Sequence, residues 1–89
     1  MATATQLGDY LRELRKGKGY NIRELGERVG CSHGLITAIE NGRRSPSLHR
    51  LWDITQALEG DFSRALYYLC VDAGIPPEAV ARLMTYSDD

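Results

Sequence analysis

Residues 21–41 read NIRELGERVGCSHGLITAIEN, and this stretch decides the fold. It holds two short apolar stripes at helical spacing, separated by the connector Gly30-Cys31-Ser32. Gly30 suits the turn because positive φ is cheap for glycine, and Gly26 is small where the two helices must approach closely. Two short helices around a three-residue turn form a helix-turn-helix, which the spacing therefore predicts.

Start and stop signals bound both helices of this motif. Asn21 is the N-cap candidate of the first helix, and Glu24 three residues later completes a capping-box pattern. Ser32 is the N-cap candidate of the second helix, which is expected to span about 32–40 and to stop at Asn41-Gly42. Both helices are therefore expected to be short and sharply bounded.

One further helix is expected before the motif and one after it. The first runs from Leu7 and is closed by Gly17 and Gly19, and the fourth has Pro46 near its first position and is closed by Gly60. The inner face of the fourth helix is expected to carry Leu48, Leu51, Trp52, Thr55 and Leu58.

Two helices are expected after residue 60. Asp61 is placed to cap a fifth helix that Gly74 ends, and a short sixth helix runs through residues 79–84. No run keeps the period of a strand, so the chain is predicted to be all-α. With 89 residues it forms one domain.

Charge divides the chain in the same way. Residues 1–50 carry a net charge of +4 and residues 51–89 a net charge of −5, although the whole chain is at −1. This asymmetry suits a module whose first half binds a polyanion. No apolar run is long enough to span a membrane and the first residues lack a signal-peptide pattern, so we expect a cytoplasmic protein without a membrane partner.

The motif residues resemble a known family. The residues that carry the resemblance are Leu14-Arg15, Ile22 to Gly26, Val29 to Ser32, Ile39 to Arg43 and Pro46-Ser47. In these residues the chain resembles the xenobiotic response element family, which includes lambdoid repressors and Cro proteins. The family usually has alanine at Gly26 and often glutamine where Ile22 and His33 stand.

The resemblance covers about residues 7–60, for which we expect a DNA-binding core, with a C-terminal extension over 61–89. It implies a five- to six-helix bundle of the lambda-repressor type and a bacterial or phage-encoded regulator. It further implies dimeric, sequence-specific binding to double-stranded DNA, with the helix over about 32–40 in the major groove. Arg15 and Glu40 are implied to form a structural ion pair between the first helix and the end of the third.

Residues on the outer face of that third helix are the candidate base readers. They are His33, Gly34, Thr37 and Ala38. Phosphate contacts are expected from Asn21, Arg23, Ser32, Asn41, Arg43 and Arg44. Alternatively, His33 merely caps the helix, Arg43 and Arg44 form an ordinary solvated turn, and Arg23 pairs with Glu27.

Other chemistries are not expected. Cys31, His33, His49 and Cys70 lack paired ligand spacing, so no metal site is predicted, and the two cysteines are expected to be reduced. No catalytic set and no phosphate-binding glycine loop is present, so the chain is not expected to be an enzyme or to bind a cofactor.

The fifth helix carries an apolar band at residues 67–71 that needs a cover. A homodimer through the fifth and sixth helices, with Tyr67, Tyr68 and Val71 as contacts, would bury it; alternatively the sixth helix covers it within one chain. Three functions are therefore open: a dimeric repressor, an antitoxin-like protein whose C-terminal half binds a partner protein, or a scaffold without DNA binding. The salt dependence of DNA binding separates the last from the others.

Overall fold

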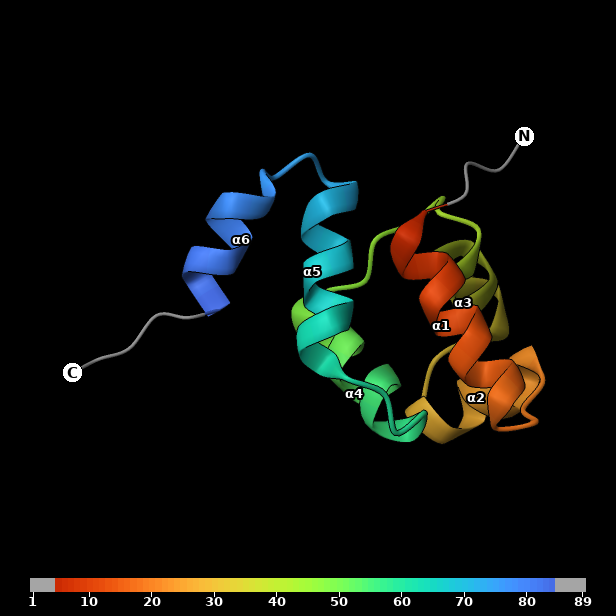
Figure 1. Cartoon of the computed structure of the whole chain (residues 1–89). Helices are drawn as coiled ribbons and strands as arrows, with labels where there is room; N and C mark the ends of the chain where they lie inside the picture. The colour runs from red at the N-terminus through yellow and green to blue at the C-terminus, as the bar shows by residue number, and fades with distance from the viewer. Residues whose placement is uncertain (1–4, 85–89) are drawn as a thin grey trace.

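The computed structural model describes residues 5–84, which form six α-helices and no strand. These are α1 (Gln6–Gly17), α2 (Ile22–Val29), α3 (His33–Glu40), α4 (Leu48–Ala57), α5 (Phe62–Asp72) and α6 (Pro77–Met84) (Figure 1). The predicted all-α fold of five to six helices is confirmed. Within this described range, no helix combines the length and apolar character needed to cross a membrane. The end of the predicted extension, 85–89, lies outside the described residues.

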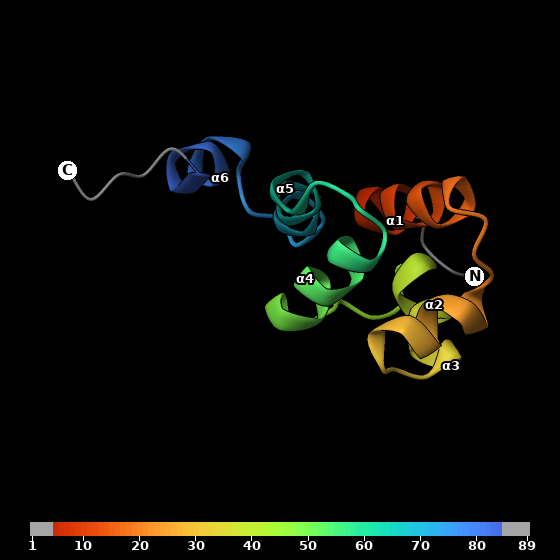
Figure 2. The same cartoon turned by 90° about the horizontal axis from the view of Figure 1, so that it is seen from below.

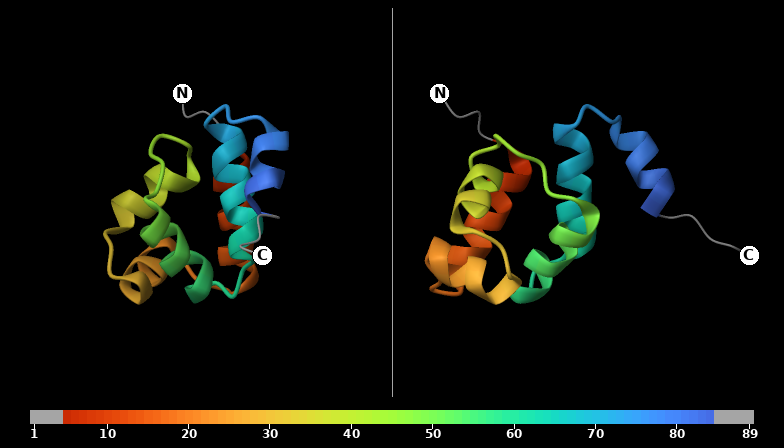
Figure 3. Two further views of the ribbon diagram at one scale, coloured as in Figure 1. Left: turned by 90° about the vertical axis from the view of Figure 1, so that its left-hand side faces the viewer. Right: turned by 180° about the vertical axis from the view of Figure 1, so that it is seen from behind.

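The helices are arranged in two layers, seen edge-on in Figure 2. One layer contains α1, α5 and α6, and the other contains α2, α3 and α4. Helix α5 packs against α1, α4 and α6, whereas α2 packs against α3 and α4. Figure 3 shows α6 lying along α5 at the outer edge of its layer. The helix-turn-helix and α6 are thus at opposite ends of the molecule.

Aliphatic side chains from five helices fill the space between the layers. The buried cluster consists of Leu7, Leu11, Leu25, Ile36, Ile39, Leu51, Ile54, Leu58 and Ala65. Each buried leucine or isoleucine contributes about 1.5–3 kcal/mol relative to an exposed one. The core therefore holds α3 by its inner face and leaves the outer face open.

The predicted turn chemistry of the motif is present. Asn21 and Glu24 form a reciprocal capping box at the start of α2. Gly30 has φ of 72°, the left-handed conformation that glycine adopts without strain. A Cβ on Gly26 would lie 2.7 Å from the carbonyl oxygen of Cys31, so the turn after α2 is what requires a small residue there.

The start of α4 differs from the prediction. Ser47, not a residue before Pro46, is the N-cap and accepts a hydrogen bond from the Arg50 backbone N–H, so Pro46 lies buried ahead of the helix. The expectation that Leu48 and Trp52 face the core is also wrong, because they are 60% and 47% exposed. At 100° per residue, the stripe of Leu51, Ile54, Thr55 and Leu58 already occupies the inner face.

The end of α4 also differs in detail. The left-handed residue is Glu59, with φ of 54°, rather than Gly60. Gly60 is required for space instead, since a Cβ there would lie 2.5 Å from Leu14 Cδ1 on α1. The glycine thus allows the turn between α4 and α5 to pass close to α1.

Candidate nucleic-acid interface

Helix α3 presents the four candidate base readers on its outer side. His33 and Gly34 are exposed, while Thr37 and Ala38 are half-buried. The Thr37 hydroxyl donates to the His33 carbonyl oxygen at 3.0 Å, which leaves its oxygen as an acceptor. A Cβ on Gly34 would meet no atom within 4 Å, so the first turn of α3 presents open backbone to solvent.

The turn after α3 folds back on the helix. The backbone N–H groups of Arg43 and Arg44 both donate to the Ala38 carbonyl oxygen, at 2.9 and 3.3 Å, and Gly42 has φ of 76°. This is a Schellman-type end, in which glycine supplies the left-handed residue. Both arginine side chains are exposed. The fold thus fixes two cationic residues beside the C-terminal end of the candidate reading helix.

The polar candidates at the helix starts are partly engaged as caps. The side-chain oxygens of Asn21 and Ser32 accept from the backbone N–H groups of Glu24 and Leu35. The Asn21 amide N–H₂ and the Ser32 O–H are left as donors to a phosphate. Arg23 is exposed, and within residues 5–84 no ion pair joins it to Glu27.

A nearly buried charge cluster fastens α3 to α1. Arg15 donates to both Glu40 carboxylate oxygens, with Nε–Oε2 at 2.7 Å and Nη2–Oε1 at 3.1 Å, and Glu40 is 3% exposed. Arg15 Nη1 also donates to the Tyr20 carbonyl oxygen at 2.9 Å. The hydrogen bond to Glu40 raises the pKa of Arg15 against the opposing effect of burial. The Arg15 guanidinium is therefore charged at every pH at which the protein is folded.

Arg12 completes this cluster, and no sequence pattern predicts this role. Its Nη2 donates to the Glu40 carbonyl oxygen and to Asn41 Oδ1, both at 3.0 Å. Asn41 is thus oriented by α1, with its amide N–H₂ group left as a donor. Helical spacing places Arg12 three residues before Arg15, but no local signal indicates that it reaches Asn41.

The cysteines and histidines of the described residues do not come together as a metal site. The Cys31 thiol lies in the turn before α3, where burial raises its pKa and the nearby Arg50 opposes the effect. Cys31 and Cys70 are free thiols. Within the described range of 5–84, no three histidine, cysteine or acidic side chains are grouped as a metal site would require.

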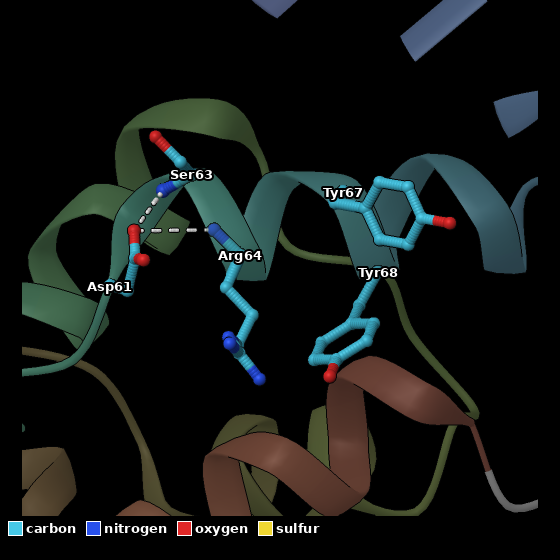
Figure 4. A pocket seen from close by; sticks show the side chains of 5 residues that line it. All are labelled: Asp61, Ser63, Arg64, Tyr67 and Tyr68. Atoms are coloured by element: carbon cyan, nitrogen blue, oxygen red, sulfur yellow. Dashed lines mark hydrogen bonds between the residues drawn. The ribbon is translucent and has the colours of Figure 1, made fainter. Parts of the chain in front are cut away.

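The C-terminal candidates Tyr67, Tyr68 and Val71 are all half-buried. The Tyr68 ring packs edge-on against Tyr10 of α1, with centroids 5.4 Å apart, so it belongs partly to the core. A hollow of about 370 Å³ lies beside α5, lined by Asp61, Ser63, Arg64, Tyr67 and Tyr68 (Figure 4). The alternative prediction was that the sixth helix covers the apolar band within one chain. In part this is what the structure shows, because α6 packs on α5 and Val80 of α6 is only 2% exposed.

Asp72 ties the end of α5 to the start of α1, which the sequence did not indicate. Its two carboxylate oxygens accept from the backbone N–H groups of Gln6 and Leu7, at 3.1 and 3.0 Å. These are free amides of a helix start, which a carboxylate both caps and stabilises electrostatically. The contact spans 65 residues of sequence, beyond the range of any capping pattern.

Comparison with known proteins agrees with this geometry. The family model described as "Helix-turn-helix domain" matches residues 6–66. An uncharacterised HTH-type transcriptional regulator of Methanothermobacter thermautotrophicus is 40% identical over 62 residues, covering 70% of this chain and 90% of that protein. The HTH-type transcriptional regulator SutR of Escherichia coli is 33% identical over 57 residues, covering 64% of this chain, which spans 32% of SutR's length.

Solved structures of one regulator are also similar. SinR, a master regulator for biofilm formation solved in complex with DNA, is 27% identical with a TM-score of 0.64, covering 68% of this chain and 98% of that one. A chain in the structure of the SinR–SinI complex is 25% identical with a TM-score of 0.64, and the match covers 90% of this chain and 80% of that one. All of these relatives are named as regulators, which agrees with the prediction that this chain is not an enzyme. This chain belongs to the helix-turn-helix family of DNA-binding proteins, in its xenobiotic response element type.

Proposed function

We propose that the protein is a cytoplasmic transcriptional repressor that binds a palindromic operator in double-stranded DNA as a homodimer. One observation carries the proposal: the outer face of α3 is open, with His33 and Gly34 exposed and two exposed arginines fixed beside its C-terminal end. An α-helix fits the major groove of B-DNA, where base edges can be distinguished. In this proposal residues 7–60 form the DNA-binding core and residues 61–89 its extension.

The division of labour along α3 follows from side-chain chemistry. His33 can donate to or accept from a purine edge, and Thr37 can accept, while Ala38 can meet a thymine methyl group. Gly34 allows close approach of the helix start. Arg43 supplies a charge to the phosphates, which positions the protein without reading sequence.

The remaining phosphate candidates surround this helix. They are Asn21, Arg23, Ser32, Asn41 and Arg44, which come from the starts of α2 and α3 and from the turn after α3. Their donors would neutralise or bind phosphates on both sides of the groove. The charge of +4 over residues 1–50 favours this polyanion despite the net charge of the whole chain.

The test is selection of bound sequences from a random duplex pool at near-physiological salt, with light scattering on the same sample. The expected result is a two-fold-symmetric site with half-sites about one helical turn apart. His33→Ala should then lose about 1–3 kcal/mol on that site and relax preference at one base pair per half-site. Arg43→Ala should weaken all sequences alike and flatten the salt dependence.

Three results would contradict the proposal, in whole or in part. Failure of a well-folded sample to enrich any sequence would exclude operator binding. Equal losses on selected and random DNA for His33→Ala would exclude that residue as a base reader. DNA binding by a protein that stays monomeric would exclude the homodimer alone.

A partner protein at the C-terminal half is a second candidate, favoured by the hollow beside α5. Arg64 and Tyr68 extend from α5 toward α1 in Figure 4, and Arg64 is exposed with no ion-pair partner among the residues described. The similar regulator SinR forms a complex with the SinI protein. Co-purification of a stoichiometric second protein, lost on Arg64→Ala, would favour this function.

A further inference from the structure

Two of the largest exposed apolar side chains lie on the same flank of α4. Leu48 is 60% exposed and Trp52 is 47% exposed, one helical turn apart. The Trp52 ring meets Phe62 of α5 edge-on, with centroids 5.2 Å apart. We call these three side chains the Leu48–Trp52 surface. Apolar surface with a polar rim marks interaction sites, and tryptophan is enriched at the centres of interfaces.

The direction of this surface follows from the contacts of α4. Arg50 extends to the Val29 carbonyl oxygen at the end of α2, at 3.4 Å, so the Arg50 side of α4 faces α2. Leu48 and Trp52 are each two residues from Arg50, which is about 200° around the helix. They therefore point away from α2. Figure 2 shows α4 at an edge of the layer containing α2, α3 and α4.

A contact at this edge has a specific geometric result. When two copies are related by a two-fold axis perpendicular to the layers, their α2–α3–α4 layers lie side by side and both α3 helices face the same way. A palindromic site requires this arrangement, because one straight duplex must meet both reading helices. The edge is also continuous with the DNA-binding face, since the turn carrying Arg43 and Arg44 leads directly into Leu48.

The other candidate face of the molecule has the opposite geometry. Ala65 is buried in the core cluster between the two layers, to which α4 contributes Leu51 and Ile54, and Leu69 packs against that cluster. Tyr67 is about 200° around the helix from each of them, so it points away from the layer that contains α3. A two-fold contact through Tyr67 would join the two outer layers and leave the α3 helices on opposite sides of the dimer.

The rim of the Leu48–Trp52 surface suits a second copy of the same surface. It carries the His49–Asp53 pair, with Nε2 and Oδ2 3.4 Å apart, and the exposed uncharged Gln56. Asp53 is the one acidic side chain that α4 contributes, so repulsion between two copies of this flank, which would oppose a self-complementary contact, is small.

We propose that the Leu48–Trp52 surface is the contact through which two copies of the protein dimerise on DNA. This inference rests on the proposed function for its two-fold operator, and it assigns the contact to α4 rather than to the free face of α5. Trp52 is the anchor because large aromatic side chains carry most of the energy of such contacts.

The test uses Trp52 as its own probe, since it is the only tryptophan in the chain. Emission is recorded over a dilution series while sedimentation gives the mass of the same samples, with and without the selected DNA. The expected result is a blue shift of Trp52 emission that coincides with doubling of the mass. Leu48→Ser, which keeps the probe, should weaken dimerisation tenfold or more but leave binding to a single half-site unchanged.

The matched control is Ile75→Ser, which removes a side chain that is 42% exposed at the turn between α5 and α6. It should change neither the mass nor the emission. A dimer that forms without a change at Trp52 and survives Leu48→Ser would overturn the assignment and leave the proposed function standing. A wild-type monomer on two-fold-symmetric DNA would overturn both the surface and the homodimer. Dimerisation at Trp52 without selective DNA binding would contradict only the proposed function.

Discussion

The helix-turn-helix and the C-terminal helices are fixed by different kinds of contact. The starts of α2 and α3 are capped by Asn21 and Ser32, which directly precede them, and the turn between them depends on Gly30. Helix α5 also has a local cap in Asp61, but its position against α1 depends on Asp72 and Tyr68, which reach residues more than 50 positions earlier. The first region is therefore specified by its own sequence, and the second by the tertiary fold.

A single substitution should therefore act differently in the two regions. A change within the motif should alter α3 and its ligand contacts, whereas a change at Asp72 should alter the relation between the two ends of the chain. The charge cluster of Arg15 and Glu40 is the exception inside the core, because it fastens the end of α3 to α1. It is also where the largest effect is expected.

Glu40→Ala should destabilise the protein by about 3–5 kcal/mol, because it leaves Arg15 charged and nearly buried without its partner. Urea unfolding followed by circular dichroism measures the change. The control is Glu59→Gln, which removes the pair with Lys18 at an exposed site and should cost less than about 1 kcal/mol. Similar losses for the two variants would show that the buried cluster does not fasten α3.

Asp72→Ala should cost about 1–2 kcal/mol, because the amides of Gln6 and Leu7 lose their acceptors. Native-state hydrogen exchange should show faster exchange at these two amides. The control, Asp61→Ala, removes the local cap of α5 and should speed exchange at Ser63 instead. If Asp72→Ala left the first turn of α1 unchanged, the two ends of the chain would be less tightly linked than the structure indicates.

Much of the fold was predictable because its signals are local. The capping box at Asn21, the left-handed Gly30 and the bounds of α3 follow from residues within a few positions of one another. The roles of Arg12 and Asp72 were not predictable, since each depends on a partner that only the tertiary fold brings near. No pattern at short range distinguishes them from ordinary surface charges.

The error at α4 has a related physical cause. Leu48 and Trp52 fit an apolar stripe at helical spacing, but Leu51, Ile54 and Thr55 fit one too. The two stripes lie on different sides of α4, so only one of them can face the core. The choice is made by the space beside α2 and α5, which the sequence does not reveal. The outer face of α3 was easier to predict, because Ile36 and Ile39 alone fix which side is buried.

Gly34→Ala separates stability from recognition within the motif. The added Cβ meets no atom within 4 Å, and alanine is favoured over glycine inside a helix by about 0.5–1 kcal/mol. The thermal midpoint should therefore rise, by roughly 4–8 °C per kcal/mol for a domain of this size. Affinity for the selected operator should fall at the same time, because the methyl group lies on the face proposed to approach the bases.

The matched control is Gly17→Ala, which also adds a Cβ in open space but at the end of α1, away from α3. It should raise stability without changing the affinity for DNA. Thermal unfolding measures the stability, and fluorescence-anisotropy titrations measure the affinity for DNA, of the wild-type protein and both variants. A loss of affinity in both variants would mean that helix rigidity, rather than the shape of the reading face, governs binding. Unchanged affinity for Gly34→Ala would remove that position from the interface.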